Sequence, residues 1–466
     1  MRRWISALFA TASALGTSAA AYGNGAFPDS ESIITPADRP QEILLVTNFG
    51  LVSSTDGAKT WLWSCEQPGN ALGTFYQLTP APKNRLFAVA NQNVAYSDDS
   101  GCSWQAGGGA VTGQSITDAY LDPVSGTRLF AIAVANQSYS LYQSTDTGMT
   151  FAPATYQTPV GVTMAGVESA RSDPNVVYVS LRTADGMPQL ARSSDGGAHF
   201  TVHDLSADLG PGLLLIIAVD PQDPNRVLFR LLSPNDQSIA LTVDGGASAT
   251  KPVTVNGNFN SFVRLPSGTI LVSGLVQFST APGLFRSHDR GSSFEMVASP
   301  PAIRALAQRA GTVYAAADNF GDGYAIGTST DEGTTWQSFM VYSDVNAINP
   351  CLKTYCQDTC GVEVSMTIWP AEVCAADAPV STGTAGRGGG TGQGGAGAGG
   401  SSGTGGTGGP PPPKHGGGCG VAGSPGARSA AVLLLAIAAA LRRRAPATAL
   451  GRAGRPDGPT PTSGSN

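Results

Sequence analysis

The amino-acid sequence predicts an all-β protein, a seven-bladed β-propeller with four-stranded blades. A short turn motif recurs seven times, and the aspartates of successive copies lie 42 to 49 residues apart, which is the length of one propeller blade. The 466-residue chain also contains 60 glycines and 32 prolines, as expected where many tight turns join short strands.

The clearest copy of the motif runs from Ser329 to Trp336 and has the order Ser, any, Asp, any, Gly, any, any, aromatic. Four further copies match at every key position. Two copies are weaker, because Ala58 replaces the glycine of the first and Ala249 replaces the aromatic residue of the fifth. Without the fifth copy the ring would have six blades. The motif aspartates are Asp56, Asp99, Asp146, Asp195, Asp244, Asp289 and Asp331.

The residue types of the motif suit a hairpin turn. Ser and Asp side chains two residues apart can hydrogen-bond to the backbone of their own turn, and Gly adopts positive φ without strain. The aromatic residue starts the next strand, where it can pack between neighbouring blades. We therefore expect the motif aspartates to build turns and not to act as catalysts.

The motif resembles the Asp box, also called the bacterial neuraminidase repeat, which occurs in sialidases, sortilin-type receptors, two-propeller xyloglucanases and photosystem II assembly factors. The resemblance covers about residues 32–341 and implies the propeller fold. It says little about activity, because these families share little chemistry.

Each repeat can be divided into four strands. In the third repeat we expect strands at residues 115–121, 128–134, 138–144 and 151–156. An Asp-Pro turn, such as Asp122-Pro123, separates the first two strands and resembles an element of sortilin-like repeats. Blade one can begin at residues 32–35 and blade seven can end at residues 337–341, so the ring can close without exchanging strands.

Residues 1–21 have the features of a secretory signal peptide: Arg2 and Arg3, a short apolar run, and small residues up to Ala21. An N-terminal membrane anchor is the alternative. The net charge of the chain is −6, and the propeller region is more acidic than this because many basic residues lie in the two terminal regions. Such a charge disfavours nucleic acid and anionic lipid as partners.

Residues 342–380 form a predicted Cys-rich disulfide module around an apolar segment, residues 362–369, which we expect to be a strand. Six cysteines precede residue 380, an even number that is consistent with three disulfides in an exported protein. Cys65 and Cys102 lie one blade apart at similar positions, so we expect them to pair, which leaves three possible pairings among the others. No histidine lies in this segment, which disfavours a zinc site. The six cysteines are Cys65, Cys102, Cys351, Cys356, Cys360 and Cys374.

Residues 381–418 are rich in Gly, Ser, Thr and Pro, a composition typical of a flexible linker. Residues 419–444 follow with Gly-Cys, a short apolar helix and Arg442 to Arg444. This order resembles the C-terminal sorting tail of myxobacterial surface proteins (MYXO-CTERM), in which the tail is removed and the cysteine takes part in processing and anchoring. The resemblance implies this role for Cys419. Residues 445–466, expected to be disordered, depart from that pattern, and a plain membrane anchor formed by the apolar helix is the alternative.

The sequence contains no strong catalytic signature. A sialidase has a Phe-Arg-Ile-Pro-like motif before its first Asp box, and the nearest match, residues 263–266, lies in the sixth repeat. A glycoside hydrolase needs two carboxylates about 5 to 10 Å apart. The residues that could supply them near the central face are Asp118, Glu168, Asp185, Asp208, Asp236, Asp318 and Asp322.

Metal and nucleophile signatures are also missing from the sequence. The four histidines do not cluster at metal-ligand spacing, and residues 318–323 lack the alternating ligands of a calcium loop. We therefore expect no metal and no cofactor.

Taken together, these patterns predict an exported monomer on the surface of a Gram-negative outer membrane. It would be held there by its C-terminal tail or by a modified Cys419. We expect a non-enzymatic binding or scaffold protein whose ligand is an extracellular protein, peptide or glycan. The alternative is an extracellular glycoside hydrolase that acts on polysaccharide.

Overall fold

The computed structural model describes residues 30–65, 73–81, 83–90, 93–277 and 281–377. The predicted signal peptide, Gly-rich linker, apolar helix, Arg cluster and Cys419 lie outside these residues.

The described residues contain six four-stranded sheets and one five-stranded sheet, and four strands of each follow one another in chain order, so the predicted seven-bladed propeller is confirmed. Blade one has β1 (Ser30–Ile34), β2 (Ile43–Thr47), β3 (Gly50–Ser54) and β4 (Trp61–Ser64). Blade two has β5 (Gly73–Leu78), β6 (Leu86–Ala90), β7 (Asn93–Ser97) and β8 (Gln105–Ala106). Blade three has β10 (Ser115–Leu121), β11 (Leu129–Ala135), β12 (Ser138–Ser144) and β14 (Tyr156–Gln157).

Blade four has β15 (Thr163–Ser169), β16 (Val177–Arg182), β17 (Pro188–Ser193) and β18 (Thr201–Asp204). Blade five has β19 (Leu213–Asp220), β20 (Asp223–Leu232), β21 (Gln237–Thr242) and β22 (Thr250–Val255), so the weak fifth repeat is a full blade. Blade six has β23 (Asn258–Arg264), β24 (Ile270–Gln277), β25 (Ala281–Ser287) and β26 (Glu295–Met296). Blade seven has β27 (Ile303–Arg309), β28 (Thr312–Ala317), β29 (Ile326–Ser329) and β30 (Gln337–Met340).

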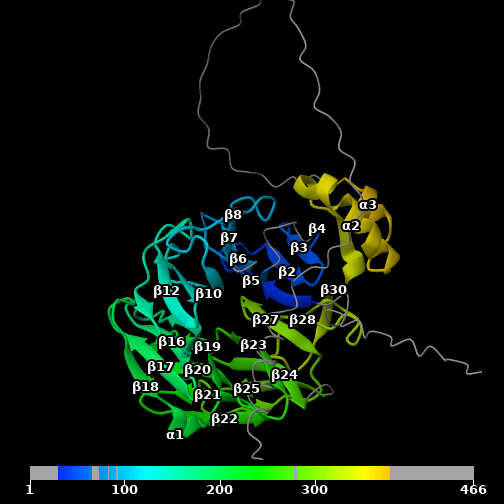
Figure 1. The fold of residues 1–466 in the computed structure, drawn as a ribbon. Helices are drawn as coiled ribbons and strands as arrows, with labels where there is room; N and C mark the ends of the chain where they lie inside the picture. Colours follow the sequence, from blue (N-terminus) through cyan, green and yellow to red (C-terminus); the bar gives the residue numbers. More distant parts are fainter. Residues whose placement is uncertain (1–29, 66–72, 82, 91–92, 278–280, 378–466) are drawn as a thin grey trace, which may run out of the picture. The chain divides into compact units, whose positions relative to one another are not determined.

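The blades follow one another around a ring, and their first strands lie nearest its middle (Figure 1). Neighbouring strands within each blade are antiparallel. The ring closes where β1 lies against β27, and a hydrogen bond of 2.7 Å joins the hydroxyls of Ser30 and Tyr342. Within the described residues, blades one and seven each take their four main strands from their own repeat, as the sequence predicts.

The core of the propeller lies between neighbouring blades. Second strands are covered by a blade on each side, so residues Val177 to Leu181 of β16 are all buried and apolar residues predominate among them. The motif aromatics take part in this packing. Phe200 of blade four stacks on Tyr156 of blade three with ring centroids 4.7 Å apart, and Trp61 contacts Phe339 across the closing junction.

Short elements complete the described part of the propeller. β9 (Gly108–Gly109) pairs in parallel with β13 (Thr150–Phe151), and α1 (Ser206–Leu209) follows β18. After blade seven come η1 (Tyr342–Asp344) and β31 (Val345–Ile348), which pairs in parallel with β4 as a fifth strand of blade one. This strand leads the chain from blade seven to the outer edge of blade one.

The Cys-rich segment is helical, so the predicted strand at residues 362–369 is wrong. It contains η2 (Pro350–Leu352), α2 (Lys353–Ser365) and α3 (Glu372–Ala375). The buried positions of α2 are Cys356, Cys360 and Glu363, and their spacing of four and three residues places them on one face of this helix. The apolar run had suggested a strand, but its Ile368 and Trp369 lie beyond the helix, where they pack against blade one.

The three disulfides connect the module to the propeller differently from our expectation. Cys65 pairs with Cys356 and Cys102 pairs with Cys351, with Cα atoms 5.6 and 5.8 Å apart, whereas Cys360 pairs with Cys374 inside the module. The predicted pairing of Cys65 with Cys102 is therefore wrong. Because β31 runs beside β4, it brings the module to the edge of blade one, so each propeller cysteine meets a module cysteine.

Candidate functional site

The motif serines and aspartates bind their own turns. In the seventh copy, Ser329 donates its hydroxyl to Asp331 Oδ1 (2.8 Å) and accepts the Gly333 N–H (2.9 Å). Asp331 Oδ1 also accepts the Thr335 N–H (2.8 Å). The same three hydrogen bonds recur in the other six copies. We refer to these seven hairpins as the Ser-x-Asp turns.

Two features of the Ser-x-Asp turns were missed in the sequence. The residue before the motif glycine also has positive φ, as in Glu332 (56°) and Gly333 (85°). A side chain six positions after the serine contacts the second aspartate oxygen. Thr335 donates its hydroxyl to Asp331 Oδ2 (2.6 Å), and serine or threonine does the same in most other copies. A Ser/Thr at this position in six of seven copies was visible in the sequence and was the signal that could have revealed it.

These hydrogen bonds keep the motif aspartates ionised. Hydrogen bonds from the Thr335 side chain and backbone lower the pKa of Asp331 to about 2. Partial burial acts to raise the pKa of Asp289, but hydrogen bonds from Ser293 and Ser287 outweigh it and lower the pKa to about 2. A carboxylate held in this way is a poor general acid or base near neutral pH. Its geometry supports the expected turn-building role.

Two predicted site residues, Asp118 and Glu168, lie on neighbouring inner strands. Burial raises the pKa of Asp118 on β10 to about 6, although the backbone N–H groups of Ala119 and Val167 bind the carboxylate and oppose this shift. Burial raises the pKa of Glu168 on β15 to about 7, and the negative charge of Asp118 contributes to this rise. The two carboxyl groups therefore interact electrostatically.

Both carboxyl groups connect one blade to the next. Glu168 Oε1 accepts the N–H of Val219 on β19 at 3.0 Å, and Asp118 binds the N–H of Val167 on β15. In blade two, Gln77 occupies the register position of Glu168 and makes an equivalent link, donating to Ala119 O (2.8 Å) and accepting the Leu121 N–H (2.7 Å).

The other five predicted acids lie on turns, on one loop and on the short helix α1, not on the inner strands that carry this pair. Asp185 and Asp236 lie in the turns β16–β17 and β20–β21, and Asp208 on α1 accepts the Ala249 N–H at 2.8 Å. Asp318 and Asp322 share the β28–β29 loop. Asp322 accepts the Ala302 N–H at 2.9 Å, and its pKa is raised by burial and by the charge of Asp318.

The inner strands also carry neutral polar groups. Asn258 and Asn260 on β23 and Gln308 on β27 are half-buried. The Gln308 Oε1 atom and the hydroxyls of Ser180 and Ser273 are buried without a hydrogen-bond partner among the described residues. Such groups are costly to leave unpaired, so bound water or a ligand is expected to satisfy them.

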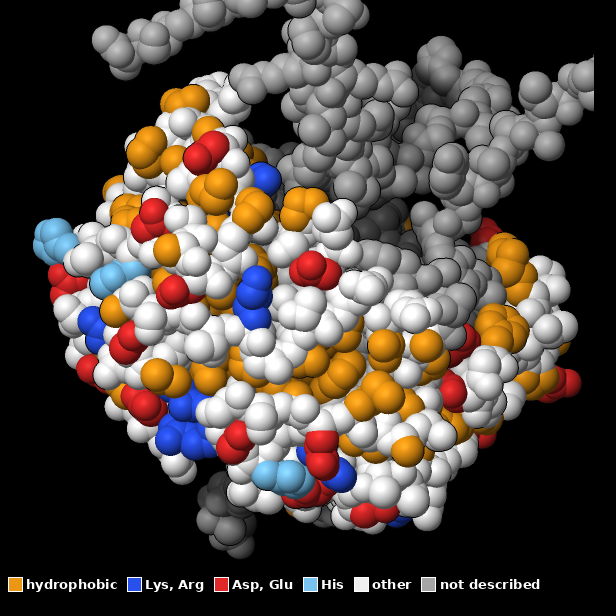
Figure 2. Space-filling view, turned by 90° about the horizontal axis from the view of Figure 1, so that it is seen from below, with side chains coloured by type: hydrophobic (Ala, Val, Ile, Leu, Met, Phe, Trp, Pro, Cys, Tyr) orange, Lys and Arg blue, Asp and Glu red, His pale blue; other side chains and the backbone are white. Residues whose placement is uncertain are grey.

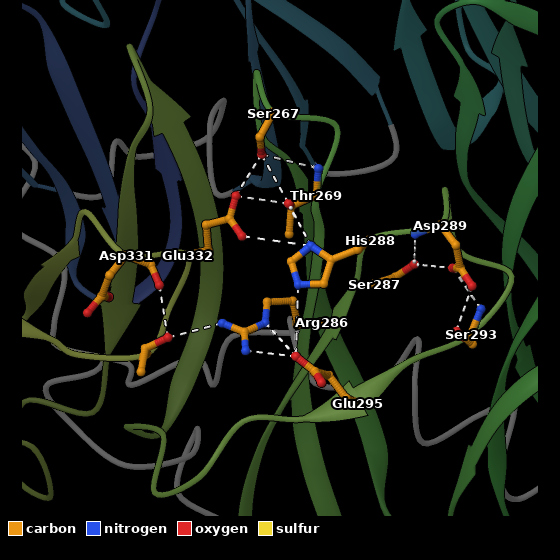
Figure 3. A network of polar contacts seen from close by, with 11 residues as sticks. Ser267, Thr269, Arg286, Ser287, His288, Asp289, Ser293, Glu295, Asp331 and Glu332 are labelled. Carbon is orange, nitrogen blue, oxygen red and sulfur yellow. Dashed lines mark hydrogen bonds and ion pairs between the residues drawn. The ribbon is translucent and has the colours of Figure 1, made fainter.

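A polar network joins blades six and seven near His288 (Figure 3). Arg286 binds Glu295 through two nitrogens, at 2.9 and 2.7 Å. Ser267 donates to Glu332 at 2.7 Å, and Thr269 Oγ1 lies 3.2 Å from His288 Nδ1. A nucleophilic triad needs a hydroxyl on one imidazole nitrogen and a carboxylate on the other. Here Glu295 lies 3.9 Å from Nε2, which is longer than a hydrogen bond, and the Thr269 hydroxyl near Nδ1 donates to Glu332 at 2.9 Å, so the arrangement is not a triad.

The described part of the chain contains no group of three or more His, Cys, Asp or Glu side chains that could hold a metal ion. No helix among the described residues is both long and apolar enough to span a membrane. Acidic and basic side chains are interspersed with hydrophobic ones on the face in Figure 2.

Comparisons with known proteins give only distant similarities. No family model and no curated protein match the chain. A GH74 enzyme from Niastella koreensis is 14% identical, with a TM-score of 0.39 over 67% of this chain and 66% of its own. A YCF48 structure with bound D1 peptide is 13% identical, with a TM-score of 0.40 over 62% of this chain and 90% of its own. A puromycin-hydrolysing peptidase from Mycobacterium tuberculosis is 12% identical, with a TM-score of 0.49 over 70% of this chain and 54% of its own. Such distant similarities do not single out an activity.

Proposed function

We propose that the chain is an exported, cell-surface β-propeller that binds an extracellular protein, peptide or glycan without chemical turnover. The seven Ser-x-Asp turns support assigning its repeats to the Asp-box type. Three disulfides support an oxidising compartment outside the cytoplasm, where such bonds persist.

The observation that carries this proposal is the use of the inner-strand acids. The carboxyl groups of Asp118 and Glu168, whose pKa values are raised, both accept backbone N–H groups of the following blade. These contacts give each carboxyl group a structural role between blades, and a catalytic role would require its other oxygen to face the substrate. The half-buried Gln308 side chain on the inner strand β27 offers an acceptor suited to ligand binding, because its Oε1 atom has no hydrogen-bond partner among the described residues. Asn258 donates to Asn260, which in turn donates to Ile303 O at 3.0 Å.

Attachment to the cell surface rests on the sequence order of the tail. Gly418-Cys419, the apolar run and the Arg cluster have the order of a myxobacterial sorting tail. We expect the tail to be removed and Cys419 to be modified in the source organism. Mass spectrometry of the mature C-terminus tests this, with Cys419→Ser as the variant that should be released or mislocalised. An intact C-terminus at Asn466 on the displayed protein would contradict it.

A glycoside hydrolase is the second candidate, and the raised pKa values of Asp118 and Glu168 favour it. A carboxyl group with a pKa of about 7 is well suited to general acid catalysis near neutral pH. The mutual influence of the two groups is also typical of catalytic carboxyl pairs.

One experiment separates the two candidates. The full chain is tested for binding to a glycan and peptide panel and, in parallel, for release of reducing sugars from the same polysaccharides. Binding that Gln308→Ala weakens, without turnover, supports the binding function. Turnover that is lost in Glu168→Gln or Asp118→Asn, with unchanged thermal unfolding, would establish the hydrolase in its place.

A further inference from the structure

A small pocket lies on the outer rim of blade four, away from the inner strands. It has a volume of about 230 Å³ and lies along β18 and the turn that precedes it. Of the four histidines in the chain, two line this pocket. The residues that line it are Arg192, Ser194, Asp195, His199, Phe200, Thr201 and His203.

His199 replaces the hydroxyl that closes most other Ser-x-Asp turns. Its Nδ1 atom lies 2.6 Å from Asp195 Oδ2, and 89% of the side chain is exposed. This contact fixes the imidazole while its Nε2 atom remains outside the turn. A carboxylate that orients an imidazole prepares the other nitrogen for a ligand.

Two further lining groups are held in place by neighbouring blades. The half-buried Phe200 ring stacks on Tyr156 of blade three, with ring centroids 4.7 Å apart. Arg192 Nε donates to the Tyr178 hydroxyl and its Nη2 donates to Asn225 of blade five, both at 3.2 Å. The pocket therefore combines a fixed aromatic ring, a fixed guanidinium, two imidazoles and the Asp195 carboxylate. Both oxygens of Asp195 are already engaged by its own turn, by the Ser193 hydroxyl, by the backbone N–H groups of Ala198 and His199 and by the His199 ring.

This combination suits one kind of ligand. An aromatic ring packs against the C–H face of a sugar, and guanidinium and imidazole groups donate to an anionic substituent. The volume lies below the roughly 300 Å³ of the smallest drug-sized pockets, so it fits a single ring. We propose that this rim pocket binds one sugar ring that carries an anionic group, either a carboxylate or a sulfate.

The rim pocket is separate from the inner-strand groups on which the proposed function rests. Loss of binding to the inner strands would leave the rim pocket intact, and the converse also holds. The two proposals can therefore fail independently.

Histidine-selective ¹⁵N NMR of the full chain tests the proposal, because only four histidines contribute signals. The chain is titrated with galacturonate, galactose 6-sulfate and galactose. Single variants of His199, His203 and His288 assign the signals. We expect galacturonate or the sulfated sugar to shift the His199 and His203 signals, and His288, which lies in blade six, to serve as the internal control.

The matched variant is the double substitution His199→Ser and His203→Thr. Serine restores the hydroxyl that closes the turns at Ser103, Ser248 and Ser293, so the fold should persist and thermal unfolding should change little. We expect this variant to bind the anionic sugar at least about tenfold more weakly. Absence of shifts with both anionic sugars, equal shifts with neutral galactose, or undiminished binding by the variant would overturn the proposal.

Discussion

A single aspartate determines the shape of each hairpin on the rim of the propeller. Asp331 accepts three hydrogen bonds through two oxygens, and its serine partner accepts the N–H of a glycine that must approach the preceding blade closely. A Cβ atom at Gly333 would lie 2.7 Å from Leu284 Cδ2 of blade six. The turn residues therefore also set the spacing between blades.

We expect Asp331→Ala to destabilise the fold by about 1 to 2 kcal/mol, because three donors lose their acceptor at a turn that stays partly buried. Urea unfolding followed by tryptophan fluorescence measures the change. The control is Thr330→Ala, an exposed neighbour in the same turn. Equal midpoints for the two variants would mean that the aspartate is dispensable for the turn.

The motif aspartates should also make the fold sensitive to strong acid. The folded-state pKa values of Asp244, Asp289 and Asp331, about 2, lie below the usual value of 3.8. Their stabilisation is therefore fully present above about pH 4 and decreases as the pH falls toward 2. Thermal unfolding temperatures should drop steeply between pH 4 and pH 2.5. A flat profile in this interval would contradict the shifted pKa values.

At the scale of the strands, side chains on the inner strand of one blade hydrogen-bond to the backbone of the following blade. Glu168 illustrates the cost of this arrangement, because burial favours its neutral form. A carboxyl group with a raised folded-state pKa contributes stability below its unfolded value, near 4.5. That contribution is lost as the pH rises through about 7.

Glu168→Gln tests this pH dependence directly. The amide oxygen can still accept the Val219 N–H, but the side chain no longer ionises, so we expect equal stability at pH 5 and greater stability than the wild type at pH 8. Denaturant unfolding at both pH values measures the effect. Asp236→Asn, on the β20–β21 turn, is the control and should show no such difference. A variant that is less stable at pH 8 would indicate a carboxylate that is needed in its charged form.

The repeating turns and strands could be predicted from the sequence. The helix, and the contacts that join segments far apart in the chain, could not. Spacing alone located all seven turns, including the one at Asp244, because their hydrogen bonds are local. The helix α2 was missed because its apolar stretch resembled a strand, although Cys356 and Cys360 had helical spacing. The proximity of Asp118 to Glu168 depends on the packing of two blades, and residue order does not encode it locally.

At the scale of the whole molecule, β1 packs against β27 to close the ring, and the helical module holds blades one and two from the outer edge. β31 carries the chain past blade one, and two disulfides attach the helical module to blades one and two. The cysteine pairing could not be deduced from the sequence because it depends on this return path.

Replacing Cys65 and Cys356 with serine should destabilise the propeller by about 2 to 5 kcal/mol, since the bond closes a long loop of the unfolded chain. Urea unfolding under non-reducing conditions measures this. We expect a smaller loss for Cys360→Ser with Cys374→Ser, because only 14 residues separate that pair. A larger loss for the Cys360 and Cys374 variant would show that the fold of the module contributes more to stability than its attachment to the propeller.

The Cys65–Cys356 bond also makes most of the chain a covalent circle. Blades two to seven all lie between these two residues, so a protease that cuts one loop in this part of the chain leaves both products joined through sulfur. On a non-reducing gel the nicked protein would run as one species, and it would separate into two fragments only after a reductant is added. A protein of this design would remain covalently connected after a single cleavage.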